Sequence, residues 1–132
     1  MTAWHEYAEG VKNGKITACK RLKQAVKRYF SDLENPLYTF DPEVVERFIA
    51  FSRVCPHVKG AMRGSPIELE PWQQFAFACI LGFKVKATGR RKYTSAFIEV
   101  PRKNAKSTTA AILANWFLIM ENGQQDIYTA AV

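Results

Sequence analysis

Residues that could bind a phosphate are concentrated in the stretch 100–109, VPRKNAKSTT. When a lysine and a hydroxyl residue open a helix, as Lys106-Ser107 would, the ammonium can contact a phosphate and the hydroxyl can ligate Mg²⁺. The helix N-terminus adds unpaired backbone N–H groups that favour an anion. The generic phosphate loop has glycine where this chain has Val100 and Ala105. The pattern by itself therefore leaves a second interpretation open, a basic turn at the start of a helix.

The segments on either side of this stretch are those that a phosphate loop requires. Residues 95–100 (SAFIEV) are short and apolar, which predicts a buried strand. Residues 107–121 are apolar on nearly all sides, which predicts a largely buried helix. Residues 127–132 (IYTAAV) predict a second buried strand. Strand, loop, helix and strand together indicate a βαβ unit.

The sequence before this unit predicts mainly helices. Asp41-Pro42 is typical of a helix start, because aspartate caps the first turn and proline suits its first position. The expected elements are helices over 4–11, from Thr17 past Leu33, from Pro42 to Cys55 and from Pro71 to Gly82, then a strand over 83–87. We place the main boundary in the loop near residue 60. It separates a helical N-terminal region, 1–60, from the start of an ATPase domain, 61–132.

Composition and charge limit the class of protein. The chain has 132 residues, 48% of them hydrophobic, which argues against disorder, and a formal net charge of +7. Such a charge favours acidic partners, nucleic acid above all. The second helix carries a basic face that is either solvated or in contact with phosphates or protein. Cysteines at three distant positions, without a CxxC pair, predict reduced, buried thiols of a cytosolic protein. No stretch has the pattern of a signal peptide or a membrane span.

The chain resembles the large terminase subunit of tailed bacteriophages, the ATP-driven motor that packages DNA. The resemblance covers mainly residues 69–132. It rests on Glu70-Pro71-Trp72-Gln73, the basic turn Gly89-Arg90-Arg91, Val100-Pro101-Arg102-Lys103-Asn104 with Lys106-Ser107, and Tyr128-Thr129-Ala130-Ala131. A loop without the early glycine is characteristic of one branch of that family. The resemblance implies an α/β fold, in which a helical region precedes the first βαβ unit of an incomplete P-loop NTPase domain with a parallel sheet.

The resemblance also implies ATP and Mg²⁺ as cofactors and a role for each matching residue. Lys106 would hold the β- and γ-phosphates, Ser107 the Mg²⁺ ion, and Thr108 would lie near the α-phosphate. Arg102 would be the catalytic candidate, because a guanidinium near the γ-phosphate can stabilise the charge in transfer. Gln73 would read the adenine edge, since an amide can pair with N6 and N7 together. The full set around the phosphates would be Arg102, Lys103, Asn104, Ala105, Lys106, Ser107 and Thr108.

Two features depart from the family pattern. Ala105 stands where glycine is usual. A right-handed backbone would tolerate alanine there, whereas a left-handed one would weaken binding by ~1 kcal/mol or more. In addition, no apolar strand ending in Asp-Glu and no cluster of nuclease carboxylates occurs in the sequence. We therefore expect this chain, as the front part of a larger motor, to bind nucleotide at most.

The partners that the resemblance implies are double-stranded DNA, the small terminase subunit and the portal protein. It further implies a homo-oligomer in the full-length motor, no membrane, and the cytoplasm of the host bacterium. Two alternatives stay open. One is a fragment of a helicase-type P-loop motor, in which a glutamine before the loop also reads adenine. The other is a non-catalytic basic module that binds DNA or a packaging partner.

Overall fold

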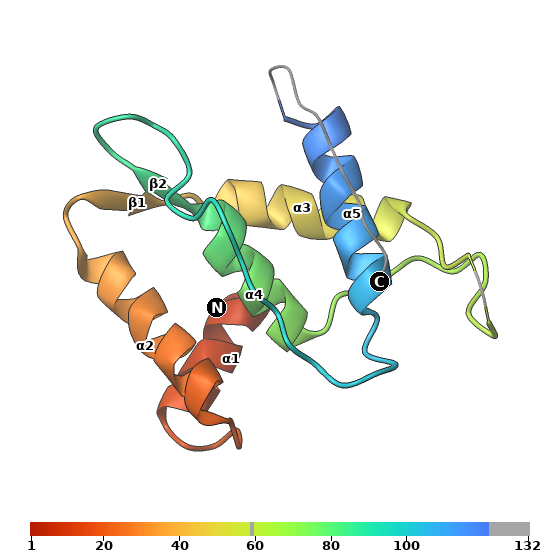
Figure 1. Cartoon of the computed structure of the whole chain (residues 1–132), viewed down its shortest axis with the longest axis horizontal. Coiled ribbons are helices and arrows are strands. Elements are labelled where there is room, and N and C mark those ends of the chain that lie inside the picture. Colours follow the sequence, from red (N-terminus) through yellow and green to blue (C-terminus); the bar gives the residue numbers. More distant parts are fainter. Residues whose placement is uncertain (59, 122–132) are drawn as a thin grey trace. The chain divides into compact units, whose positions relative to one another are not determined.

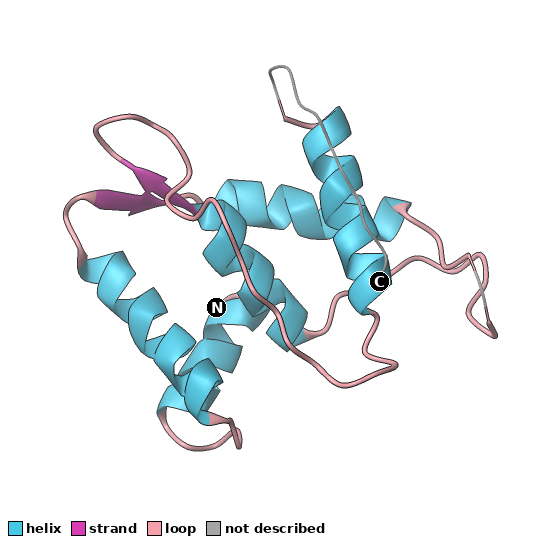
Figure 2. Cartoon of the chain, in the orientation of Figure 1, coloured by secondary structure: helices cyan, strands magenta, loops and turns pink. Residues whose placement is uncertain are grey.

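The computed structural model describes residues 1–58 and 60–121 (Figures 1 and 2). These residues form five helices and one two-stranded antiparallel sheet. In chain order the elements are α1 (Ala3–Lys12), α2 (Lys20–Glu34), β1 (Tyr38–Phe40), α3 (Pro42–Val54), α4 (Pro71–Gly82), β2 (Phe83–Val85) and α5 (Lys106–Ile119). The fold is thus a mixture of helices with a small sheet. Across the described ranges, no helix is long and apolar enough to cross a membrane.

The chain divides into two compact units. One comprises residues 1–50 and 68–96, and the other comprises residues 51–67 and 97–132. Each unit therefore combines a segment before residue 60 with a segment after it. The expected division into 1–60 and 61–132 stays a prediction about domains.

An aromatic cluster forms the centre of the first unit. Tyr29 of α2 is 2% exposed, and its ring centroid lies 5.5 Å from that of Phe75 and 5.8 Å from that of Phe83. Trp4 and Val11 of α1 are buried in the same core, seven residues apart on one helix face. Burial raises the pKa of Tyr29 to about 12, so its hydroxyl stays protonated and contacts His5 Nδ1 at 3.1 Å. The apolar faces of α1, α2 and α4 thus meet in one core.

The small sheet joins the end of α2 to the end of α4. Phe40 pairs with Phe83, and Tyr38 pairs with Val85. A Cβ atom on Gly82 would lie 2.3 Å from the Phe40 ring, so only glycine fits beside that ring. The predicted strand over 83–87 is confirmed for residues 83–85. The sequence did not predict β1, because three residues are too few to show a strand pattern.

Asp41 connects the start of α3 with β2. Its Oδ1 accepts the Val44 N–H at 3.3 Å, which confirms the predicted helix cap. Its Oδ2 accepts a hydrogen bond from Lys84 Nζ at 2.8 Å, and its own N–H donates to the Gly82 carbonyl at 2.8 Å. The hydrogen bond from Lys84 lowers the pKa of Asp41 below its ordinary value of 3.8, against the opposing effect of partial burial.

We expect Asp41→Asn to change how stability depends on pH. Because the folded-state pKa of Asp41 is lowered, its carboxylate stabilises the fold above the unfolded-state value of 3.8. That stabilisation is lost as the pH falls through the folded-state pKa. The parent should therefore exceed Asp41→Asn in free energy of unfolding near neutral pH, and the difference should shrink below about pH 4. Urea unfolding at a series of pH values measures this. Lys84→Met, which removes the donor, should reproduce the profile. A difference that is constant across the acid range would contradict the linkage.

A buried carboxylate near the end of α2 holds the segment that follows the basic turn 89–91. Asp32 is 6% exposed and accepts hydrogen bonds from Lys92 Nζ and from the Tyr93 hydroxyl. Lys92 Nζ also lies 3.8 Å from the centroid of the Tyr38 ring. Burial and the Asp32 carboxylate raise the pKa of Tyr93, which keeps its hydroxyl a donor. The three side chains therefore form one charged and hydrogen-bonded cluster.

The second unit is built from the end of α3, the loop after it, and α5. Phe51 packs edge to face against Trp116 of α5, with ring centroids 5.6 Å apart. Ser52 Oγ donates to the Ile67 carbonyl at 3.3 Å, and the Ile67 N–H donates to the Cys55 carbonyl at 3.1 Å. These hydrogen bonds hold the loop between α3 and α4 against the C-terminal end of α3. Residues 97–105 of this unit have no strand partner among the described residues.

Several expectations for this part of the chain are wrong. Residues 95–100 form no strand, and the Phe97 side chain is 89% exposed. A strand needs a partner for its backbone groups, and none is present in the described ranges. Helix α5 forms as predicted but is not largely buried, since Leu118 and Ile119 are 62% and 66% exposed. The predicted strand over 127–132 lies outside the described residues.

Two smaller expectations are also corrected. Helix α2 begins after Cys19 and not after Thr17. The cysteines are free thiols, as predicted, but none is fully buried: Cys19 is exposed, and Cys55 and Cys79 are half-buried. Burial raises the pKa of Cys79 to about 12, so this thiol stays protonated and unreactive.

Candidate phosphate-binding loop

The backbone before α5 alternates in handedness. Lys103 has φ 66°, Asn104 has a negative φ, and Ala105 has φ 54° and ψ 26°, which is left-handed. Lys106 then begins the right-handed helix. A backbone that alternates in this way turns successive N–H groups toward one side and forms a concavity for an anion. The segment 103–106 thus has two left-handed residues and no glycine, which makes it a candidate for such a concavity.

The first turn of α5 contributes further donors. The N–H groups of Lys106, Ser107 and Thr108 have no intrahelical acceptor, because the first bond of the helix runs from the Thr109 N–H to the Ala105 carbonyl at 2.9 Å. Ala105 has no side chain that could cap them, and no side-chain cap is present. The positive end of the helix dipole lies at the same place. The unpaired N–H groups of the first turn therefore follow directly, along the chain, on the N–H groups of the preceding loop.

The Lys106 side chain folds back toward the start of the loop. Its Nζ donates to the Val100 carbonyl at 2.8 Å, six residues back along the chain. An ammonium has three donors, so this bond leaves two for a ligand. Asn104 Nδ2 donates to the carbonyls of Pro101 at 3.1 Å and Arg102 at 3.2 Å, which holds the preceding turn. The ammonium, the loop and the helix start thus belong to one short stretch of chain, as the sequence predicted.

Ala105 takes the less favourable of its two expected conformations. The left-handed region costs a residue with a Cβ roughly 1–2 kcal/mol, whereas glycine adopts it freely. Ala105 is the N-cap residue of α5, a position that is more often extended, and here it is left-handed. The loop therefore carries backbone strain at Ala105.

Ala105→Gly is accordingly expected to preserve or raise stability. It removes ~1–2 kcal/mol of left-handed strain and adds ~0.5–1 kcal/mol of backbone entropy cost, for a net gain between zero and about 1.5 kcal/mol. Ala111→Gly is the matched control, because Ala111 is exposed within α5, where glycine should cost ~1 kcal/mol. Urea unfolding of both variants gives the comparison. Equal destabilisation by the two substitutions would show that Ala105 is not strained.

The other predicted residues of the loop are accessible. Arg102, Lys103 and Ser107 are exposed, and Thr108 is half-buried at the third position of α5. The Ser107 hydroxyl is one oxygen ligand of the kind that Mg²⁺ accepts. Among residues 1–58 and 60–121, no group of three His, Cys, Asp or Glu side chains could hold a metal ion. A Mg²⁺ ion at Ser107 would therefore depend on phosphate oxygens that the nucleotide brings, which is how this ion is commonly held.

Gln73 belongs to the first unit, whereas the loop belongs to the second. It is 6% exposed, and its Oε1 accepts the Glu70 N–H at 2.9 Å. The Glu70 side chain in turn accepts the N–H of Gln73, so the two residues form a capping box with Pro71 at the first position of α4. Sequence reasoning missed this role, although Glu-Pro-x-Gln before an apolar run is a signal for it. The adenine contact stays a prediction.

Comparison of the chain with family models, with curated proteins and with solved structures finds no match. The local geometry of the loop is therefore what indicates its chemistry. Backbone donors, a helix N-terminus and an ammonium converge within residues 103–108, and such an arrangement suits a phosphate group. A carboxylate that could act as a base does not occur in the stretch 100–109. The chemistry that the stretch 100–109 itself offers is hydrogen-bond donation to an anion.

Proposed function

We propose that the loop 100–109 binds the phosphates of ATP, as the phosphate loop in the N-terminal part of a phage terminase large subunit. The observation that carries this proposal is the position of Lys106. Lys106 is the first residue of α5 and directly follows the left-handed Ala105. Its Nζ donates a hydrogen bond to the Val100 carbonyl at 2.8 Å. In a phosphate loop, the helix N-terminus and the backbone before it would face the phosphates together with this ammonium.

Each residue of the loop has a role in the proposed site. The backbone of Lys103, Asn104 and Ala105 surrounds the phosphates, and Lys106 exchanges the Val100 carbonyl for the β- and γ-phosphate oxygens. Ser107 holds the Mg²⁺ ion, which neutralises phosphate charge when it is bound. Arg102 is exposed and long enough to approach the γ-phosphate, and Thr108 lies near the α-phosphate. For Gln73, the adenine contact is carried over from the resemblance alone, and its amide would have to leave the capping box to make that contact.

The proposal assigns nucleotide binding to this chain and packaging to the motor of which it would be a part. In that motor, residues 95–100 would be a strand of a parallel sheet next to α5. The exposed side chains of Phe97, Leu118 and Ile119 support this arrangement, because apolar surface of this kind is normally covered. The proposed partners are double-stranded DNA, the small terminase subunit, the portal protein and further copies of the motor, in the cytoplasm of the host bacterium.

Titration with Mg-ATP, followed by the backbone amide signals in nuclear magnetic resonance spectra, tests the proposal. The shifts are expected at residues 103–108, where the donors converge, with a further shift at Gln73 if it contacts adenine. Adenosine should leave the loop signals unchanged, and pyrophosphate should compete with ATP for them. Shifts that spread over the basic face of α2 and spare the loop would contradict the proposal and favour a general basic module. The absence of any shift at millimolar Mg-ATP would contradict it as well.

A further inference from the structure

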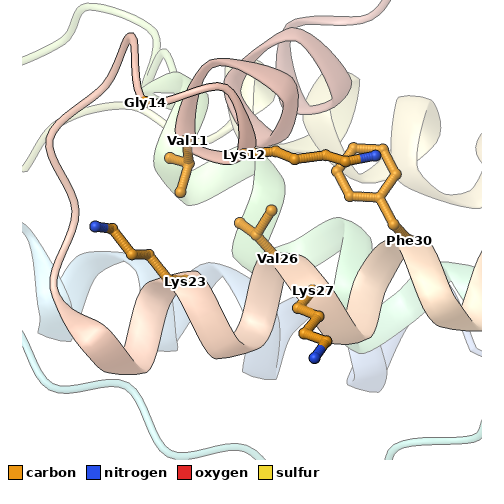
Figure 3. Close-up of a pocket in the computed structure, with 7 residues that line it drawn as sticks. All are labelled: Val11, Lys12, Gly14, Lys23, Val26, Lys27 and Phe30. Carbon is orange, nitrogen blue, oxygen red and sulfur yellow. The ribbon is translucent and has the colours of Figure 1, made fainter.

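A pocket with a basic rim lies between α1 and α2, within the first unit (Figure 3). Its volume is about 350 Å³, and its lining consists of Val11, Lys12, Gly14, Lys23, Val26, Lys27 and Phe30. Val11 and Val26 are each 2% exposed, and their side chains lie between the two helices. Lys12 and Lys23 extend to opposite sides of them, whereas Lys27 extends away from α1 (Figure 3). The pocket therefore combines an apolar interior with a positive rim.

The rim follows directly from helix periodicity. Lys23, Lys27 and Phe30 lie at i, i+4 and i+7 on one side of α2. Helix α1 contributes Lys12, whose Nζ lies 4.3 Å from the centroid of the Phe30 ring. Over the described residues, the ion pairs within 4 Å involve other side chains, and no carboxylate lines the pocket. Like charges that are gathered without a counter-charge repel each other, so a negative partner would be stabilised here.

We propose that this pocket docks an acidic segment of another protein, which inserts one apolar side chain between α1 and α2 and pairs its carboxylates with Lys12, Lys23 and Lys27. The volume lies within the ~300–1,000 Å³ that ligand pockets occupy, so there is room for an anchor side chain. The anchor contacts the Phe30 ring and the stems of the lysines, and the carboxylates on either side of it meet the ammonium groups. Charge complementarity of this kind selects the partner and speeds its association.

Other occupants fit the pocket less well. A DNA phosphate needs only polar donors, so it would leave the apolar interior unused. A second copy of this chain carries a net charge of +7 and would be repelled. The inference is independent of the phosphate loop, because α1 and α2 belong to the first unit and the loop to the second.

A synthetic peptide of about 12–15 residues tests the docking site. It carries glutamates along its length and one central leucine, and the control peptide has serine in place of that leucine. Amide and methyl signals of the chain are recorded during titration. The leucine peptide is expected to shift Val11, Val26 and Phe30, and the serine peptide to bind at least about fivefold more weakly, because the anchor is lost. Equal affinities of the two peptides would overturn the proposal, as would the absence of shifts at these residues.

Paired charge reversals decide between a docked segment and nonspecific attraction. The variant Lys23→Glu/Lys27→Glu is expected to weaken binding of the leucine peptide about tenfold or more, because two rim contacts become repulsive. The variant Lys20→Glu/Arg21→Glu is the control, since it changes the charge of the same helix equally outside the pocket lining. It should have a much smaller effect. If both variants weaken binding equally, or if a short DNA duplex shifts the same residues and displaces the peptide, the proposed acidic segment is wrong.

Discussion

Lys106→Ala is expected to weaken the binding of Mg-ATP by about ten- to a hundredfold, the factor that corresponds to a charge-assisted hydrogen bond of ~1.5–3 kcal/mol. The Lys106 side chain folds back along the loop, and its ammonium donates a hydrogen bond to the Val100 carbonyl at 2.8 Å. Its removal leaves the backbone donors of residues 103–108 in place, so weak binding of phosphate should persist. Isothermal titration calorimetry with Mg-ATP measures the change.

The matched control is Lys86→Ala, because Lys86 is an exposed lysine of the first unit and its loss changes the net charge equally. Its affinity for Mg-ATP should stay within about twofold of the parent value. Thermal unfolding of Lys106→Ala separates loss of the contact from loss of the fold. If Lys106→Ala and Lys86→Ala bind Mg-ATP equally well, the stretch 100–109 is not a phosphate loop.

Asp32→Ala should lower the free energy of unfolding by ~3–5 kcal/mol, the largest effect on stability that we expect in this chain. The substitution leaves Lys92 with a side chain that is only 17% exposed and without its carboxylate partner. It also removes the acceptor of the Tyr93 hydroxyl, which burial keeps protonated. Because a buried charge without a partner costs more than the pair contributes, the loss exceeds that of one hydrogen bond. Urea unfolding measures the difference.

Two further variants distinguish this cause from simple loss of packing. Glu34→Ala removes an exposed carboxylate from the same helix and should change stability by no more than about 0.5 kcal/mol. The double variant Asp32→Leu/Lys92→Met replaces the pair by apolar side chains and should recover most of the loss, because neither charge then stays unpaired. If the double variant is as unstable as Asp32→Ala, the buried ion pair does not explain the effect.

Local sequence was sufficient where a structure depends on neighbouring residues only. The starts of α3 and α4 were predicted from Asp41-Pro42 and Glu70-Pro71, since a cap and a first-turn proline act within one turn of a helix. The loop before α5 was likewise found from its residue types alone. Its lysine, hydroxyl and helix start are consecutive along the chain, so no distant contact is needed to bring them together.

Tertiary structure decided the features that depend on distant partners. The pairing of β1 with β2 and the bonds from Lys92 and Tyr93 to Asp32 join residues more than forty positions apart, which no local pattern encodes. Residues 95–100 have the composition of a strand, but a strand exists only where a neighbour satisfies its backbone groups. For Ala105, the sequence did not decide between a right-handed and a left-handed backbone. The structure places it in the left-handed region, and a short-range pattern could not decide this, because N-cap residues are more often extended.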